Sequence, residues 1–305
     1  EILRSDWSSD VCSSDLLDKE NKRRTVVLLL MVLSVLNVFA QLSSRGKDTP
    51  TSTTDRLSSD SEYKLIFNDE FNQPDGTLPD ISVWKSCRRR PKVTWARYLS
   101  NSPEVAFIKD GKLILRAIPN SNKSAVGEEM LTGGIETSHS FAFRYGRVEC
   151  RARVNPFDGN FPAIWMMPRT TLPWPQGGEI DIFEQIDQEQ RTYSTVHSAW
   201  TRSHGNLPHS GNIELDMSLF HTYAVEWEPS ILTFFADGKQ VYQYKKEPDN
   251  PEQWPFDKSD FYLILNQSVG DGSWAKPVDT THTYQMEIDW IRVYQRDKTN
   301  INKRK

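Results

Sequence analysis

Three acidic residues in one short segment, Glu179, Asp181 and Glu184, have the types and spacing that best suit catalysis. Side chains of a β-strand alternate between two faces, so Glu179 and Asp181 share a face and Glu184 falls on the other. One β-bulge around 182–183 would return Glu184 to the first face, and bulges commonly direct side chains into active sites. Like charges on one face raise the pKa of at least one carboxyl, which can then stay protonated beside an ionised one.

The separation of these carboxylates indicates a reaction class. With the bulge, Glu179 and Glu184 are four steps apart, about 13 Å along the strand at about 3.3 Å per residue. Side chains that lean inward bring the carboxyl groups to about 5 Å, which is the separation found in retaining glycosidases. A solvent-facing acidic strand or a calcium site is the structural alternative for the same pattern.

The elements that must position these residues are short alternating strands separated by turn residues. The segment 236–239, ADGK, lies between two apolar runs and predicts a hairpin. Long periodic helices are missing, so we expect an antiparallel β-sandwich with long loops at 119–131, 168–178 and 200–216. We expect strands at 63–71, 111–119, 146–154, 179–186, 193–200, 222–229, 231–238, 239–245, 261–269 and 286–295.

Composition and charge exclude several classes of protein. The 305 residues include 37 Lys+Arg against 41 Asp+Glu, a net charge of −4, and the composition is that of a globular protein. No basic block is large enough to predict a nucleic-acid partner. Ten Trp, ten Tyr and 14 Phe suit β-structure and flat stacking surfaces.

The first 40 residues are expected to lie outside the fold. Residues 1–15 resemble translated sequencing-adapter read-through, and we treat them as an artefact. Residues 16–40 combine a basic cluster, a short apolar run and a small-residue exit, which predicts a secretory signal removed after Ala40. The apolar run, 26–39, is shorter than the roughly 20 residues of a spanning helix.

The remainder is expected to form one domain. Residues 41–61 are rich in Ser, Thr and Asp and predict a polar linker, and 297–305 predict a polar tail. Residues 62–296 are then a single catalytic domain without internal repeats.

The sequence of residues 179–184, E-I-D-I-F-E, resembles the E-x-D-x-x-E signature of glycoside hydrolase family 16, in the bulged form of laminarinase-like members. Further matching segments follow in the family's order at 66–71, 110–117, 145–154, 161–168, 194–198, 220–239, 261–270 and 287–295. The resemblance implies a concanavalin-like β-jelly roll, a sandwich of two antiparallel sheets with a concave substrate cleft. It also implies retaining endo-hydrolysis of β-linked polysaccharides. By motif position, Glu179 looks like the nucleophile, Glu184 like the general acid/base and Asp181 like the residue that tunes the nucleophile.

Residues around this cluster are expected to bind the glycan. His197, on the next strand, would donate to a carboxylate or a sugar hydroxyl, and Trp165 fits a family position on the cleft floor, where an indole plane suits a sugar face. Alternation puts either Asn266 or Gln267 on the concave face, where an amide can bind hydroxyls. Further subsites are predicted at the tryptophans of loops, Trp95, Trp174, Trp200 and Trp274.

Catalysis is expected to need no cofactor, but a structural metal is implied by the resemblance. Family members often hold Ca²⁺ on the convex face, and Glu70, the carbonyl of Gly111 and Asp289 match those positions. Oxygen ligands suit this ion.

Two other groups of residues leave alternatives open. Arg88, Arg89 and Arg90 form either an anion patch or, as three basic residues usually do, a solvated turn. Cys87 and Cys150 either form a disulfide in an oxidising compartment or stay as buried thiols.

The sequence therefore predicts a bacterial endo-β-glycanase, secreted or periplasmic and monomeric, whose partner is a polysaccharide. We expect no nucleic-acid partner and no membrane insertion after signal cleavage. The favoured substrate is β-1,3- or mixed β-1,3/1,4-glucan. Gln267-Ser268 and Asp271–Trp274 depart from the laminarinase pattern, so an endo-β-1,4-galactosidase acting on poly-N-acetyllactosamine, keratan or mucin O-glycans is the alternative. A non-catalytic carbohydrate-binding jelly roll is an alternative of a different class, disfavoured because both glutamates are present.

Overall fold

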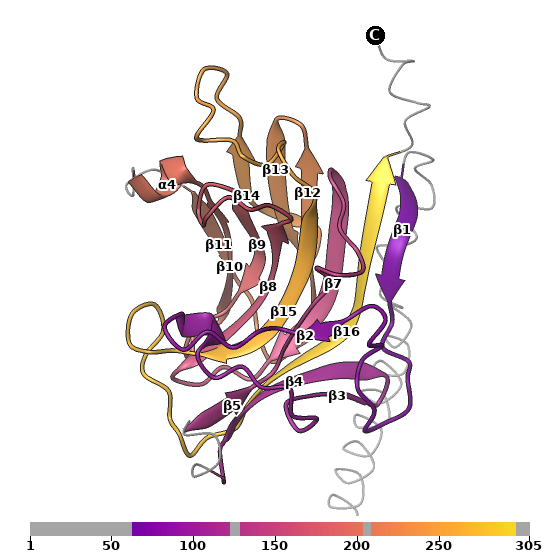
Figure 1. Ribbon diagram of the computed structural model, residues 1–305, viewed down its shortest axis with the longest axis vertical. Helices are drawn as coiled ribbons and strands as arrows, with labels where there is room; N and C mark the ends of the chain where they lie inside the picture. The colour runs from indigo at the N-terminus through magenta and orange to yellow at the C-terminus, as the bar shows by residue number, and fades with distance from the viewer. Residues whose placement is uncertain (1–62, 123–128, 204–208, 297–305) are drawn as a thin grey trace, which may run out of the picture. The chain divides into compact units, whose positions relative to one another are not determined.

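The computed structural model describes residues 63–122, 129–203 and 209–296, which fold into two antiparallel sheets (Figure 1). The expected artefact, signal peptide, linker and tail lie outside the described residues. Across the described ranges, no helix has the length and apolar character needed to cross a membrane. The predicted fold class, an antiparallel β-sandwich, is confirmed.

The first sheet has nine strands within the described ranges, in the spatial order β14-β13-β12-β7-β16-β4-β3, with β1 beside β16 and β5 beside β4. They are β1 (Tyr63–Asp69), β3 (Ala106–Lys109), β4 (Lys112–Pro119), β5 (Met130–Thr132), β7 (Gly146–Val154), β12 (His221–Glu228), β13 (Ile231–Ala236), β14 (Lys239–Lys245) and β16 (Tyr284–Arg296). The predicted hairpin is confirmed between β13 and β14. Its two loop residues, Asp237 and Gly238, both have positive φ, as this tight turn requires.

The second sheet has seven strands in the described part of the chain, in the order β11-β10-β9-β8-β15-β6-β2. They are β2 (Lys85–Ser86), β6 (Gly134–Glu136), β8 (Asn160–Pro168), β9 (Glu179–Glu184), β10 (Arg191–His197), β11 (Ser210–Glu214) and β15 (Phe261–Val269). Two short helical segments, η1 (Thr94–Ala96) and α4 (Ala199–Ser203), lie in its connections.

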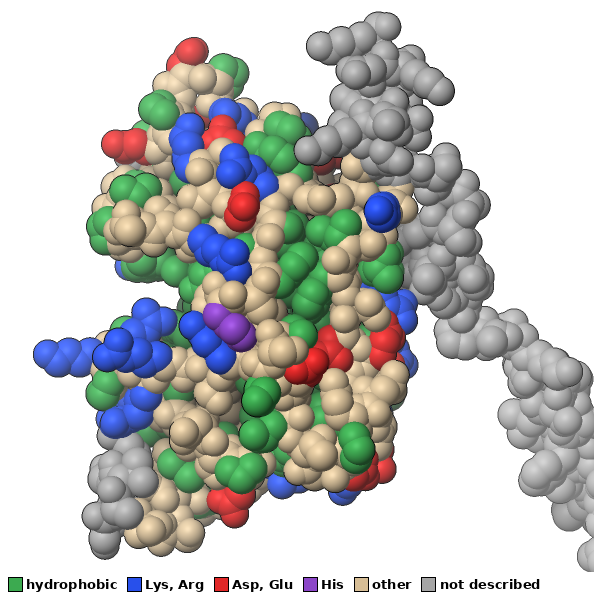
Figure 2. Space-filling view, turned by 45° about the vertical axis from the view of Figure 1, so that its right-hand side comes forward, with side chains coloured by type: hydrophobic (Ala, Val, Ile, Leu, Met, Phe, Trp, Pro, Cys, Tyr) green, Lys and Arg blue, Asp and Glu red, His purple; other side chains and the backbone are tan. Residues whose placement is uncertain are grey.

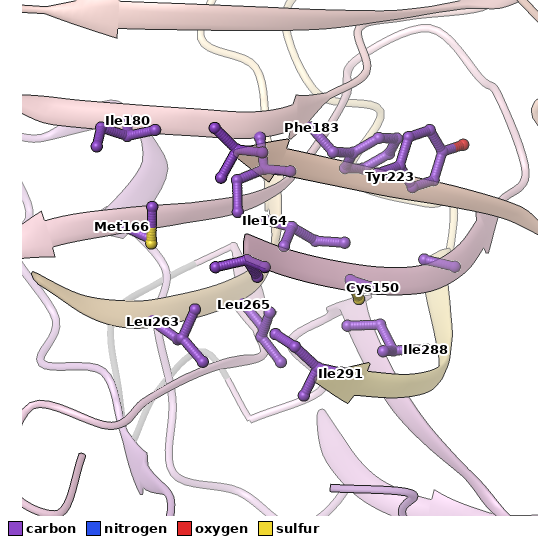
Figure 3. Packing of buried hydrophobic residues seen from close by; sticks show 14 of the residues in the cluster. Cys150, Ile164, Met166, Ile180, Phe183, Tyr223, Leu263, Leu265, Ile288 and Ile291 are labelled. Carbon is purple, nitrogen blue, oxygen red and sulfur yellow. The ribbon is translucent and has the colours of Figure 1, made fainter. Parts of the chain in front are cut away.

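The core lies between the two sheets (Figure 3). The inner face of the seven-stranded sheet contributes Ile180, Met166 and Leu263, which are fully buried. Phe183 of β9 meets Tyr223 of β12 from the opposite sheet, with ring centroids 4.5 Å apart. The strand that holds the three carboxylates is therefore fixed from behind by packing.

A second apolar cluster lies on the outer face of the seven-stranded sheet. Ala163 and Trp165 of β8 and Ile264 of β15 pack there against Cys87, Ala96 and Leu99. The segment Cys87–Leu99, which we call the arginine loop, thus covers part of this outer face. Elsewhere the same face holds the carboxylates of β9.

This double burial explains the strand that sequence alternation missed. The segment β8 is apolar on both faces, because Ile164 and Met166 point into the main core while Ala163 and Trp165 face the second cluster. A strand covered on both faces shows no alternation of apolar and polar residues. Further differences are β11, which lies inside the loop predicted at 200–216, and the short strands β2, β3, β5 and β6, which were not predicted.

The two cysteines of the domain do not form a disulfide. Cys150 is a buried free thiol in the core between the sheets (Figure 3), and Cys87 is a buried free thiol in the second cluster. Burial raises the pKa of both thiols well above the usual value. Of the two alternatives left open by the sequence, buried thiols are the one observed.

The residues expected to bind calcium are engaged by arginines instead. Arg292 of β16 donates from Nε and Nη2 to the two carboxylate oxygens of Glu70, each at 2.8 Å, and these hydrogen bonds lower the pKa of Glu70. Asp289 is held by Arg151 of β7. A cation at Glu70 would face the guanidinium of Arg292, and a cation at Asp289 would face that of Arg151, so these carboxylates do not fit Ca²⁺.

We therefore expect EDTA to leave the melting temperature of the protein unchanged. Arg292→Ala should lower the free energy of unfolding by about 1–2 kcal/mol, between the values typical of exposed and buried ion pairs. Arg191→Ala, which removes a more exposed pair with Glu214, serves as the control and should cost less. A melting temperature that falls in EDTA and recovers only with Ca²⁺ would contradict this account.

Candidate active site

The three carboxylates reach one face because β9 contains an extra residue. Against β10, Asp181 is opposite Thr195 and Glu184 is opposite Tyr193, so three steps on β9 correspond to two on β10. The register against β8 shifts at the same place. The adjacent residues Ile164 and Trp165 of β8 are opposite Phe183 and Asp181, so β8 has no partner for Ile182. Ile182 is thus the added residue, and the predicted bulge is confirmed.

A different group lies next to each of the three carboxylates. The indole Nε1 of Trp174 donates to Oε2 of Glu179 at 2.7 Å. The ring nitrogen Nε2 of His197 lies 3.3 Å from Oδ2 of Asp181 and 3.7 Å from Oε1 of Glu179. Glu184 receives a longer hydrogen bond, 3.3 Å, from the hydroxyl of Thr195. Glu179 therefore has the closest donor of the two glutamates.

Burial and mutual repulsion disfavour negative charge in this cluster. Burial, followed by the charge of Asp181, raises the pKa of Glu179 and of Glu184 to about 8. Burial also raises the pKa of Asp181 to about 8, although a hydrogen bond with Glu179 acts in the opposite direction. The side chain of Asp181 is nearly enclosed, whereas 16% of the Glu179 side chain is exposed. The site therefore keeps at least one of its carboxyl groups protonated at neutral pH.

The residues of β10 that face the cluster repeat every second position. Tyr193, Thr195 and His197 are opposite Glu184, Asp181 and Glu179 respectively. His197 has the predicted position beside the carboxylates, and the alternation in Y-S-T-V-H was the signal that Thr195 belongs to the same face. The Nδ1 atom of His197 is buried without a hydrogen-bond partner in the described part of the chain.

A ligand set for a cation also exists within this cluster. Glu179, Asp181 and His197 each offer an atom, and these atoms lie within 4.8 Å of one another. The raised pKa values of both carboxyls mean that a cation would have to displace protons to bind. We therefore interpret the cluster as an acid–base centre.

Trp174 is the loop tryptophan that contacts the carboxylates. It lies in the β8–β9 connection and is 47% exposed. Its ring is tilted against the ring of His197, with a centroid distance of 5.9 Å. The guanidinium of Arg202, on α4, lies 5.1 Å from the centre of its ring. Sequence reasoning predicted Trp174 as a subsite residue but missed its hydrogen bond to Glu179.

Trp165 lies next to the carboxylates but is not an open platform. Its backbone is opposite Asp181, as a residue of the site floor should be. Its side chain is only 5% exposed, because the edge of Trp95 packs against it at a centroid distance of 4.8 Å. Trp165 therefore supports the site, and its predicted role as a stacking surface is corrected.

The two amides predicted to bind sugar are buried. Asn266 shares the outer face with Trp165 and accepts its indole N–H at 2.6 Å. Gln267 points to the inner side of the sheet, where its amide donates to Oδ1 of Asn160 at 2.8 Å. Both side chains are at most 1% exposed, so they position neighbouring residues and have no surface to offer a glycan.

The two remaining tryptophans lie on opposite sides of the cluster. Trp274 is 51% exposed and packs edge-on against Tyr193, which is opposite Glu184 in the sheet. Trp200 is half-buried on α4, and its backbone N–H donates to the backbone carbonyl oxygen of Glu252. Tyr262, which the sequence analysis missed, faces the outer side of β15. Burial and then the charge of Glu136 raise its pKa to about 12, and Glu179 contributes in the same direction.

Comparison with known proteins places this geometry in a family. The profile of "Glycosyl hydrolases family 16" matches residues 100–292. A keratan-sulfate endo-1,4-beta-galactosidase of Sphingobacterium multivorum is 32% identical over 241 residues, covering 77% of this chain and 56% of that protein. A beta-glucanase of Rhodothermus marinus is 31% identical over 311 residues, covering 93% of this chain and 99% of that protein.

A solved structure agrees with the sequence matches. The laminarinase from Rhodothermus marinus superposes with a TM-score of 0.69 and 30% sequence identity, and the match covers 77% of this chain and 98% of that one. The chain thus spans little more than half of the galactosidase it matches and nearly all of the two Rhodothermus proteins.

The electrostatics of the site predict a stabilising mutation. The pKa of Glu179 is about 8 in the folded protein and about 4.3 in an unfolded chain, so the folded state binds more protons between these values. Stability therefore falls as the pH rises from about 4 to about 8. Glu179→Gln removes this loss, and its melting temperature should exceed that of the unmodified protein more at about pH 9 than at about pH 4.

Thermal unfolding across this pH range tests the prediction. Glu214→Gln, at a side chain that is 80% exposed, is the matched control and should leave the profile unchanged. A Glu179→Gln profile parallel to that of the unmodified protein would show that Glu179 is not protonated in the folded state.

Proposed function

The chain belongs to glycosyl hydrolase family 16, and from that premise we propose that it is a retaining endo-β-glycanase that cleaves internal bonds of a β-linked polysaccharide. The observation that supports this most directly is the bulge at Ile182, which gathers two glutamates and an aspartate on one face of β9. Two carboxyl groups in different environments are what a retaining glycosidase needs.

The contacts of the two glutamates suggest how their roles divide. Glu179 accepts a short hydrogen bond from Trp174 and lies near His197, and both favour its charged form. Among the described residues, Glu184 accepts only the long hydrogen bond from Thr195, and the charge of His197 acts on it without contact, so its proton is more readily kept. We therefore assign Glu179 as the nucleophile and Glu184 as the general acid/base.

The reaction then proceeds in two steps. A carboxylate oxygen of Glu179 attacks the anomeric carbon, the glycosidic C–O bond breaks, and the proton of Glu184 passes to the leaving oxygen. In the second step Glu184 removes a proton from water, whose oxygen attacks the same carbon and releases Glu179. Asp181, between the two and close to His197, orients the nucleophile and adjusts its charge.

Two glycan classes are candidates for the substrate. β-1,3- or mixed β-1,3/1,4-glucan is the first, because the Rhodothermus relatives are named a beta-glucanase and a laminarinase. A galactosidic glycan of the keratan or mucin type is the second, because a keratan-sulfate endo-galactosidase matches over most of the chain. The departures at Gln267-Ser268 and Asp271–Trp274 favour this second class.

Substitution of the two glutamates tests the catalytic assignment. Glu184→Gln should reduce turnover of a natural polysaccharide by about 10²–10⁴-fold, the usual contribution of general acid–base catalysis. On an aryl oligosaccharide, whose leaving group needs no proton, the glycosylation step of this variant should survive and azide should restore turnover. Glu179→Gln should be inactive on both substrates.

The control for these variants is Glu214→Gln, which neutralises an exposed carboxylate on β11, two strands from β9, and should keep full activity. Binding of oligosaccharide without turnover by the unmodified protein would instead indicate a non-catalytic carbohydrate-binding jelly roll. Substantial activity in Glu179→Gln would overturn its role as nucleophile.

A substrate panel separates the two glycan classes. The panel contains laminarin, mixed-linkage β-glucan, and a keratan or mucin O-glycan preparation, with Glu179→Gln as the blank. Oligosaccharides released from the glucans alone would establish the first candidate. Release from the galactosidic sample alone would establish the second and keep the same catalytic residues.

We also propose that the protein is exported, on the strength of the basic cluster followed by the apolar run 26–39. Sequencing the N-terminus of protein recovered outside the cytoplasm tests this proposal. A mature chain that begins at Gln41 is the expected result, and retention of residues 16–40 would contradict it.

A further inference from the structure

The arginine loop, Cys87–Leu99, carries four exposed cationic side chains beside the active site. They are Arg88, Arg90, Lys92 and Arg97. None of the four forms an ion pair within the described part of the chain, whereas Arg147, Arg151, Arg153 and Arg292 of the nine-stranded sheet all do. The sequence pattern alone indicated a solvated turn at 88–90, but the loop is built more firmly than a solvated turn.

The loop is fastened to the sheet by the residues that depart from the laminarinase pattern. The hydroxyl of Ser268, at the end of β15, donates to the carbonyl oxygen of Trp95 at 2.6 Å. The hydroxyl of Thr94 donates to Asp271 at 2.6 Å. The unusual segment after Asn266 therefore has a physical role, which is to hold the arginine loop against the outer face of the sheet.

The cations are oriented within the loop. A hydrogen bond of 2.9 Å from the N–H of Arg90 to the carbonyl of Ala96 closes the turn. The guanidinium of Arg90 then lies over the Trp95 ring, 5.0 Å from its centre. Because Trp95 packs in turn against Trp165, a guanidinium is fixed above a rigid aromatic support and its N–H edge remains available.

This support connects the loop with the catalytic carboxylates. Trp165, beneath Trp95, is opposite Asp181 in the sheet. Burial and the charge of Glu136 raise the pKa of Tyr262. The charge of Arg90 lowers this pKa and that of Glu179 raises it, so both residues lie within electrostatic range of the Tyr262 hydroxyl. Figure 2 shows Lys and Arg side chains gathered on a projecting part of the surface beside an indentation.

From these observations we propose that the arginine loop is a subsite for an anionic substituent, a sulfate ester or a carboxylate, on the glycan held at Glu179 and Glu184. The inference rests on the proposed function and specifies its substrate class. Guanidinium groups present paired N–H donors that match the oxygens of sulfate and carboxylate. A neutral glucan offers no group that would use four unpaired cations.

The position of the cations away from β9 is consistent with this role. A cation in contact with Glu179 or Glu184 would stabilise the charged carboxyl and remove the raised pKa on which acid catalysis depends. An anion placed directly against these carboxylates would be repelled. Recognition of a charged substituent therefore belongs one or more sugar units from the scissile bond, and two tryptophans, Trp95 and Trp165, separate Arg90 from Asp181.

A matched set of three substrates tests the proposal. The backbone that the substrate panel identifies is compared in three forms, which are neutral, sulfated and carrying sialic acid, so that the two sources of charge are distinguished. The protein with Arg88→Ala, Arg90→Ala and Lys92→Ala should show a KM about tenfold or more higher on the charged form that the protein prefers, as expected for lost charge-assisted hydrogen bonds. Its kcat and its KM on the neutral form should stay within about twofold.

The control variant removes the same charge from the opposite sheet. It combines Lys109→Ala, Lys239→Ala and Lys245→Ala, all exposed, and should behave as the unmodified protein on every substrate. Arg90→Lys should recover only part of the affinity, because an ammonium group lacks the planar pair of donors. Added salt should weaken binding of the charged form and leave the neutral form unaffected.

A binding arm separates failure of this inference from failure of the proposed function. Affinity for sulfated, sialylated and neutral oligosaccharides is measured with Glu184→Gln, alone and combined with the loop variant. If no backbone is cleaved but the loop variant still loses affinity for the charged forms, the subsite stands and the proposed reaction fails. Equal KM values for the loop variant and the unmodified protein on all forms would overturn the subsite. Binding of duplex DNA as tight as that of the charged glycan would also overturn it.

Discussion

The constraint on which this site depends is the alternation of side chains in a β-strand, broken once at Ile182. Without the extra residue, Glu184 would point into the core among apolar side chains, where an unpaired carboxylate is strongly unfavourable. With it, Ile182 and Phe183 both turn inward, and Phe183 packs against Tyr223 of the opposite sheet. The core therefore stabilises the irregular strand, and the irregular strand places the acid beside the nucleophile.

The same packing sustains an arrangement that is unfavourable in itself. Three carboxyls whose pKa values are raised to about 8 share a few ångströms of one strand face, and the donors near them are an indole, an imidazole and a hydroxyl. Within the described ranges, no hydrogen bond or ion pair joins any of the three to an arginine or lysine. Arginine–carboxylate pairs are instead concentrated on the nine-stranded sheet, as at Arg147–Glu149 and Arg292–Glu70. The nine-stranded sheet is thus stabilised by such pairs, whereas the three acids of β9 have no basic partner among the described arginines and lysines and stay available for proton transfer.

Sequence reasoning succeeded where local periodicity carried the information. The strands with clear alternation, the bulge and the position of His197 follow from side-chain parity on single strands. It failed where tertiary contacts decide, as for β8, which is covered on both faces and shows no alternation. Asn266 and Trp165 have the expected parity, yet a distant loop covers them. The calcium positions matched by motif, but Arg292 and Arg151 come from strands whose pairing the sequence does not reveal.

The outer face of the seven-stranded sheet has two unequal halves, and this asymmetry determines how a glycan can lie on it. Over β6, β15 and β8 the arginine loop replaces solvent with an apolar cluster, which leaves Arg90 and its neighbours at the boundary. Over β9 and β10 the face stays open, with Trp174 beside Glu179 and Trp274 near Glu184. A chain bound at the carboxylates must leave the open half past the edge of the loop. Charge on the sugars at that edge is therefore the property of the substrate that this protein is best placed to distinguish.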